Sequence, residues 1–224
     1  MSTNSPVLTA AFWRTRRAAA VAGIIFGLLL LTAMALARVA MSDSAYEILL
    51  ADDDRRRLIR LSLHLVPFAG IAFLWFIGVI REQLGAVEDR LFSTVFMGSG
   101  LLFLALLFSG AAISSSLILM LEQPSSSADI WSYGQSTSQG LISVYAMRMA
   151  AVFTISVSTA GLRAAALPRW VSYLGYVVAL LLLVGSADQK WLQLTFPAWV
   201  LLVSTAILLT HPRERAARDA MDGA

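Results

Sequence analysis

Two ionisable side chains inside apolar stretches are the residues of this sequence best placed to do chemistry. Arg148 lies within the apolar stretch 141–160, and His64 lies near the start of another. A charge inside a membrane helix costs about 2.5–3.5 kcal/mol, so we expect Arg148 to face a bundle interior or a wet cavity and to find a partner there. Either it ties helices together, with Glu122 or Asp188 as the nearest carboxylate, or it binds an anionic ligand.

His64 follows Arg60 by one helical turn, so both would share one helix face. Because histidine titrates near neutral pH, His64 could sense protons or bind a ligand. The alternative is a neutral imidazole bonded to a neighbouring helix. Other polar side chains reach the same level and predict a polar cavity that opens outward above an apolar floor. The candidate cluster is Arg148, His64, Arg60, Tyr145, Glu122 and Gln193.

Several kinds of chemistry are excluded or disfavoured by what the sequence lacks. It has no cysteine, and its two histidines do not have metal-ligand spacing. No nucleophile and base form a recognisable pair; Met97 stands where the motif GxSG of intramembrane serine proteases needs its first glycine. We therefore expect no enzyme activity, no metal and no cofactor. Basic residues lie between apolar runs rather than along one helix face, so we also expect no nucleic-acid partner.

Composition identifies the solvent in which the candidate residues must be positioned. The chain has 224 residues, of which 58% are hydrophobic and 14% charged, whereas soluble domains are about 45–50% apolar and about 25% charged. A spanning helix needs about 20 mostly apolar residues. The sequence predicts six such helices, near residues 18–37, 61–80, 93–121, 141–160, 170–186 and 192–210. We thus expect an all-α, six-helix transmembrane bundle over 18–210, with cytoplasmic segments 1–17 and 211–224.

Orientation follows from the positions of lysine and arginine in the short loops. With both termini cytoplasmic, the inner segments hold ten basic residues and the outer segments six, with Arg148 left inside a span. Most of the outer ones lie near the run Asp-Asp-Asp-Arg-Arg-Arg at 52–57. If helical, this run pairs Asp52 with Arg56 and Asp53 with Arg57 at i,i+4, and the second helix begins about one turn beyond the membrane.

Two further features concern loops and partners. Residues 122–140 are rich in Ser, Gln and Gly, which predicts a mobile outer loop. The third apolar stretch carries small residues that let helices approach closely, either inside one subunit or against a membrane-protein partner or second copy. These small residues include Gly98, Gly100, Gly110 and Ser114.

The segment Leu167-Pro168-Arg169-Trp170, followed by Leu174 and Gly175, resembles a pattern in uncharacterised bacterial multi-pass membrane protein families of unknown function. In those families a similar segment opens a late helix, and the basic flank of the first helix is similar to Arg14–Gly23 here. The resemblance implies a helix start and a multi-pass topology, and it implies no activity.

Together these features predict a multi-pass protein of a bacterial plasma membrane, in contact with the lipid bilayer. The function we expect is that of a non-enzymatic accessory or scaffold protein that binds membrane partners. The alternative is a small carrier or ligand-binding protein with an outward-facing cavity around Arg148 and His64. A closed, dry bundle would favour the scaffold, whereas a polar cavity reaching Arg148 would favour an anionic ligand.

Overall fold

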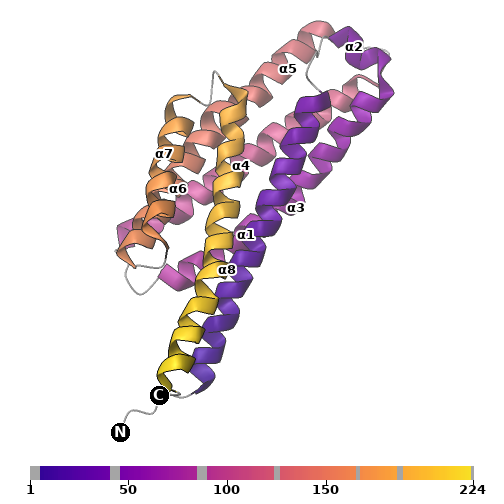
Figure 1. Cartoon of the computed structure of the whole chain (residues 1–224). Coiled ribbons are helices and arrows are strands. Elements are labelled where there is room, and N and C mark those ends of the chain that lie inside the picture. The colour runs from indigo at the N-terminus through magenta and orange to yellow at the C-terminus, as the bar shows by residue number, and fades with distance from the viewer. Residues whose placement is uncertain are drawn as a thin grey trace.

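A computed structural model describes residues 6–40, 46–84, 90–123, 127–164, 167–185 and 189–222 of the chain. Within these ranges the protein is helical and contains no strand (Figure 1). The elements are α1 Pro6–Ala40, α2 Tyr46–Ala51, α3 Asp53–Leu84, α4 Arg90–Met120, α5 Ala128–Gly140, a π-helix η1 Leu141–Ala146, α6 Met147–Arg163, α7 Arg169–Val184, a 3-10 helix η2 Lys190–Leu194 and α8 Thr195–Asp222. The expected all-α class is confirmed.

The long helices run up and down beside one another. α1 packs against α3 and α8, α4 packs against α3 and α6, and α7 packs against α6 and α8. α1 begins and α8 ends at the same end of the bundle, which we call the terminal end (Figure 1). Because α1 begins at Pro6 and α8 ends at Asp222, the helices reach into the segments 1–17 and 211–224 that the sequence set apart.

Within the described residues, five helices are long and apolar enough to cross a membrane, as expected of a multi-pass membrane protein. They cover Ala20–Ala40, Asp53–Arg81, Ser93–Met120, Ala128–Arg163 and Trp191–Leu209. A further apolar helix, α7, has 16 residues and is about 24 Å long at 1.5 Å per residue. It is therefore shorter than a hydrocarbon core of about 30 Å.

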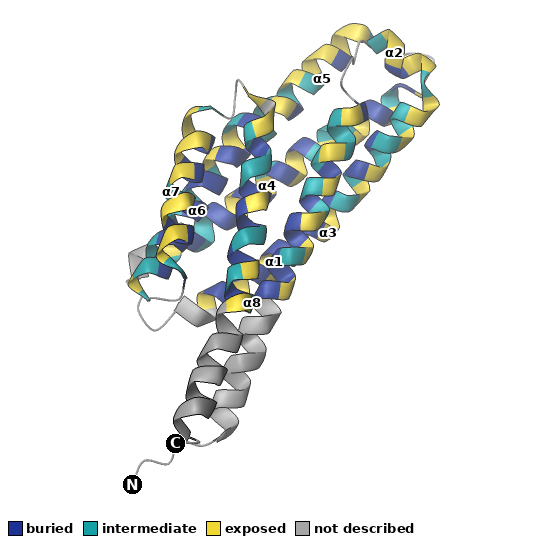
Figure 2. Ribbon diagram, viewed as in Figure 1, coloured by how far each residue is buried: buried dark blue, intermediate teal, exposed yellow. Residues whose placement is uncertain are grey.

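Phenylalanine side chains fill the centre of the bundle. Seven are fully buried, and they come from α1, α3, α4, α6 and α8: Phe26, Phe73, Phe76, Phe96, Phe103, Phe153 and Phe196. Phe73 is the hub, because its ring centroid lies 4.5 Å from that of Phe26, 5.1 Å from Phe153 and 5.3 Å from Phe103. Tilted and edge-on pairs at these distances are favourable for aromatic rings. Figure 2 shows buried positions alternating with exposed ones along the helices, as expected when one face of each helix is turned inward.

A second, smaller apolar cluster lies at the opposite end of the bundle. It joins the end of α1, α2, the beginning of α3, the end of α4 and α5, and we call this part the extension. Its buried members are Ala40, Leu49, Ile59, Leu117, Ile118, Leu121 and Trp131. The rings of Tyr46 and Trp131 pack with centroids 6.4 Å apart. Figure 1 shows α2 and α5 at the upper right, beyond the upper ends of α7 and α8.

The expectation of a mobile loop over residues 122–140 is wrong for the part of this segment that forms α5. This helix begins at Ala128 and continues through η1 into α6. Its buried residues, Trp131, Gly134 and Ser138, recur at helical spacing and face α4. A Cβ atom at Gly134 would lie 2.7 Å from a methyl carbon of Leu117, so glycine allows this close approach without a shift of the leucine side chain. The serine-rich composition concealed a helix that is stabilised by packing.

Residues 53–57 of the charged run are helical and Asp52 directly precedes them, but the ion pairs of the run differ from the expected ones. Arg55 Nε lies 3.1 Å from Asp52 Oδ2, and Arg56 pairs with Asp53, so both pairs are at i,i+3 rather than i,i+4. Arg56 turns back because its Nη1 also donates to the carbonyl oxygens of Leu49 and Leu50 at the end of α2, 2.6 Å in each case. α3 begins at Asp53, about two turns before residue 61 rather than one.

Candidate functional site

Arg60 and Glu122 form the one pair of predicted site residues that an ion pair joins within the described chain. Arg60 Nη1 lies 2.5 Å from Glu122 Oε1, and both side chains are 42% exposed. The pair connects α3 to the turn that follows α4 and closes one side of the extension. Glu122 is therefore the partner of Arg60, and the expectation that it would pair with Arg148 is wrong.

Gln193 is buried and hydrogen-bonded. Its Nε2 donates to Ser143 Oγ over 2.7 Å, which links η2 to the π-helix η1. One turn before η1, Ser138 Oγ donates to the carbonyl oxygen of Gly110 over 2.8 Å and lies 2.7 Å from Ser114 Oγ. These contacts satisfy polar groups where α5 and α6 meet, and π-turns of this kind often occur at functional sites. Sequence reasoning selected Gln193 but missed Ser143 and Ser138.

Arg148 does not face the bundle interior, so that expectation is wrong. Its side chain is exposed on the outward face of α6, with Tyr145, 58% exposed, one turn nearer the extension. The neighbouring inward positions are Met147, Ala150 and Ala151, all fully buried. Close packing at these positions leaves the inner face of α6 without space for a guanidinium group, which therefore lies on the outside.

The contacts between α6 and α7 show what lies level with Arg148. The hydroxyl of Ser158 contacts Gly175, and Thr159 Oγ1 lies 2.7 Å from Tyr176 Oη. The two helices are antiparallel, so positions equally far from this contact in opposite chain directions lie at the same height along the bundle. Ten residues before Ser158 is Arg148, and ten residues after Gly175 is Gly185. Arg148 is thus level with Gly185, where α7 ends. Asp188, the other expected partner, lies outside the described residues.

His64 is exposed on the outward face of α3. α4 packs against both α3 and α6, so it lies between the helices that carry His64 and Arg148. The structure therefore does not bring these two residues together, and the space between their helices is filled by the phenylalanine cluster. Of the six predicted site residues, it brings together Arg60 with Glu122 and places Tyr145 on the same face as Arg148.

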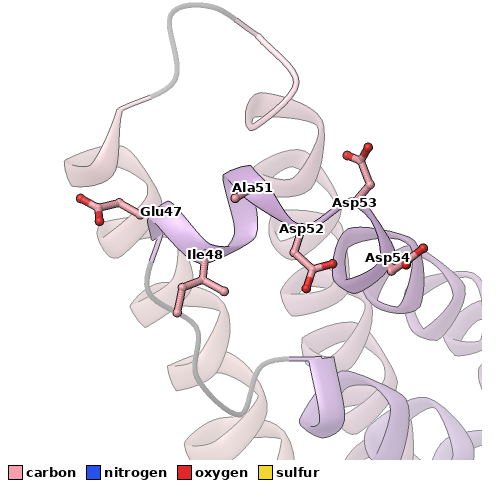
Figure 3. Close-up of a pocket in the computed structure, with 6 residues that line it drawn as sticks. All are labelled: Glu47, Ile48, Ala51, Asp52, Asp53 and Asp54. Carbon is pink, nitrogen blue, oxygen red and sulfur yellow. The ribbon is translucent and has the colours of Figure 1, made fainter.

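An open pocket of about 620 Å³ lies in the extension, where α2 meets α3. Its lining residues are Glu47, Ile48, Ala51, Asp52, Asp53 and Asp54. Figure 3 shows the carboxylates of Glu47 and Asp54 pointing away from each other. Asp52 and Asp53 are paired with arginines. Among the described residues no cluster has a metal-binding arrangement.

The small residues of α4 lie on two faces. A Cβ atom at Gly100 would lie 2.6 Å from Ile77 Cδ1, and one at Gly110 would lie 2.6 Å from Ile142 Cγ1. With Ser114 bonded to Ser138, these residues serve packing inside the subunit. Gly98 is different, because nothing lies within 4 Å of its Cβ position. Exposed small residues continue its outward row along α4, namely Ala105, Ser109, Ala112 and Ser116.

Comparison with known proteins gives no relative: no family model matches the chain, and neither the curated proteins nor the solved structures contain a match. The resemblance of the segment 167–170 to uncharacterised bacterial families stays a prediction. In the structure Pro168 precedes α7, which begins at Arg169, as a helix-start segment should.

Proposed function

We propose that this protein is a six-span accessory or scaffold protein of a bacterial plasma membrane, which binds membrane partners and catalyses no reaction. The observation that carries the proposal is the closed centre of the bundle, where seven phenylalanine side chains are fully buried. A carrier needs a polar path through this region. A scaffold needs a rigid body with partner surfaces on its outside, and a ring-packed core provides that rigidity.

The proposed topology counts α7 as the sixth crossing and places both termini in the cytoplasm. α3 and α6 carry Arg81 and Arg163 in their last turns, and α7 begins at Arg169. These three residues lie at the terminal end, and basic residues in short loops favour the cytoplasmic side. A helix of 16 residues is accommodated by local thinning of the bilayer or by polar flanks that extend past its ends.

The proposed partner surface is the outward face of α4. Lipid-facing helices usually present large aliphatic side chains, as α7 does with Val177, Leu180 and Val184, which are all exposed. α4 also exposes large side chains, among them Leu102 and Leu119, but between them it presents a row of exposed small residues that α7 lacks: Ala105, Ser109, Ala112 and Ser116. Small residues on a membrane helix allow a second helix to approach closely. This face is therefore suited to a helix of a partner protein or of a second copy.

Cysteine cross-linking tests the proposal, because the natural chain has no cysteine. Ala105→Cys and Ala112→Cys are oxidised in native membranes, and Val177→Cys and Leu180→Cys on α7 serve as matched exposed controls. We expect the α4 variants to form a disulfide-linked dimer, or to be covered by a partner and react slowly with a thiol reagent. If all four cysteines react equally fast and form no dimer, α4 faces lipid and the scaffold proposal fails.

A further inference from the structure

Arg148 is a charge on the outside of a membrane helix. Val152 and Ile155 are part-exposed on the same side of α6, so its surroundings along the helix are apolar. The ion pairs of Arg55, Arg56 and Arg60 lie in the extension, and none of them includes Arg148. A charge at membrane depth is costly without a counter-charge, and an anionic headgroup of the surrounding lipid is one anion that can reach an outward-facing guanidinium.

The depth of Arg148 indicates where that anion must lie. Arg163 ends α6 at the terminal end, and 15 residues separate it from Arg148, which corresponds to about 22 Å along the helix. In a hydrocarbon core of about 30 Å, Arg148 lies roughly 8 Å below the far boundary. A long arginine side chain bends toward the headgroups from such a depth. Tyr145 lies one turn nearer that boundary on the same side of α6.

The helix end beside Arg148 does not neutralise its charge. α7 ends level with Arg148, and its last carbonyl groups are acceptors at the negative end of the helix dipole. They attract a guanidinium group but carry only partial charge. Arginine has five donors in a planar fork, and this fork matches the oxygens of a phosphate group. The phenol of Tyr145 adds one more donor, one turn nearer the boundary toward which the arginine side chain bends.

We propose that Arg148 and Tyr145 bind the phosphate group of a phospholipid in the leaflet at the extension end. The guanidinium binds two phosphate oxygens, and the tyrosine hydroxyl donates to a third acceptor of the headgroup. The acyl chains then lie along Val152 and Ile155 on the outward face of α6. This lipid site is independent of the α4 surface, so either proposal can fail without the other.

Native mass spectrometry of the delipidated full chain, titrated with phosphatidylglycerol in detergent, tests the site. We expect Arg148→Gln to weaken binding of one lipid roughly tenfold and Tyr145→Phe roughly threefold. Arg169→Gln, which removes an exposed arginine at the terminal end, is the matched control and should leave that lipid bound. Arg148→Lys keeps the charge and loses the fork, so it should fall between wild type and Arg148→Gln.

Three outcomes would overturn the proposal. Equal lipid affinity of wild type and Arg148→Gln would show that no site exists there. Stabilisation of the lipid-free protein by inorganic phosphate alone, to the extent that lipid achieves, would identify a free anion as the ligand. Equal loss of thermal stability in Arg148→Gln and Asp188→Asn, with lipid binding unchanged, would assign Arg148 to an ion pair within the chain. If an arginine variant folds poorly, Tyr145→Phe still tests the site, because it removes one proposed headgroup contact and leaves Arg148 in place.

Discussion

The phenylalanine core and the extension bury apolar residues in two different ways. The core gathers seven fully buried rings from five helices, each within 6.5 Å of another. The extension packs the rings of Tyr46 and Trp131 together with aliphatic side chains, and it has an ion pair at its edge. The core lies among membrane-spanning segments, and the extension lies beyond the ends of α7 and α8.

In the proposed topology the core lies in the hydrocarbon of the membrane and the extension lies beyond it, so we infer that the difference follows from the solvent of each region. Between helices in lipid the hydrophobic effect gives little driving force, so association depends on close packing and on interhelical hydrogen bonds. Rings and glycine contacts supply such packing in the core. In the extension, apolar burial from water stabilises directly, and polar contacts add orientation. A substitution that removes a packed ring from the core should therefore lower the free energy of unfolding most. A substitution that removes an exposed charge from the extension should lower it least.

The largest effect is expected for Phe73→Ala. Phe73 contacts five other buried rings, so truncation leaves a cavity that its rigid neighbours cannot close. We expect a loss of about 3–5 kcal/mol in the free energy of unfolding, measured by denaturant titration in mixed micelles. Phe68→Ala on the same helix is the matched control, because Phe68 is 63% exposed; it should change stability by less than about 0.5 kcal/mol. Equal losses in both variants would show that the ring cluster does not hold the bundle together.

The next effect is expected for Trp131→Ala, and it should be local. Trp131 is the buried ring that α5 contributes to the apolar cluster of the extension, where α5 packs against α4 and the ring contacts Tyr46 of α2. Its removal should destabilise the extension by about 3 kcal/mol, with loss of amide hydrogen-exchange protection in α2 and α5 and none in α6. Tyr133→Ala, at a position 76% exposed on the same helix, should leave protection unchanged. Simultaneous loss of protection in α6 would show that core and extension unfold as one unit.

A smaller effect is expected for Gly23→Ala, where α1 meets the core. A Cβ atom there would lie 2.8 Å from Phe76 Cδ2 and would also meet the hydroxyl of Ser204. Overpacking of this kind costs about 1–3 kcal/mol. Gly78→Ala, on the outward side of α3 where nothing lies within 4 Å, should instead stabilise by up to about 1 kcal/mol, since alanine favours helix. Thermal unfolding of both variants distinguishes overpacking from a general effect of removing glycine.

Sequence reasoning could predict the helices because hydropathy measures burial in lipid directly. Each of the six apolar stretches lies largely within a helix of the structure. α5 was missed because its polar outer residues dominate its composition, while its buried positions are few and spaced by three and four residues. The extension as a whole depends on contacts between segments distant in sequence, and no local pattern reports such contacts.

The candidate site was predicted less well, because hydropathy gives the depth of a residue and not the side of the helix on which it lies. Residues 147–161 are apolar or small almost all round, so the sequence contains no stripe that reveals the inward face of α6. The packing of Met147 and Ala151 determines which face of α6 points inward, and Arg148 therefore lies on the outward face. Gln193 was selected for its polarity at membrane depth, but its partner Ser143 is aligned by a π-turn that no spacing rule predicts.

The smallest effect is expected for the ion pair between Arg60 and Glu122. Both side chains are 42% exposed, so water and salt screen their attraction, and a coupling of about 0.2–1 kcal/mol is expected. A double-mutant cycle of Arg60→Gln and Glu122→Gln measures this coupling as the non-additive part of the two stability losses. It should shrink from low salt to about 0.5 M salt, while the cost of Phe73→Ala should not change. A coupling that persists at high salt would mean that the pair is shielded from solvent, and the extension would then resemble the core more closely than its exposure indicates.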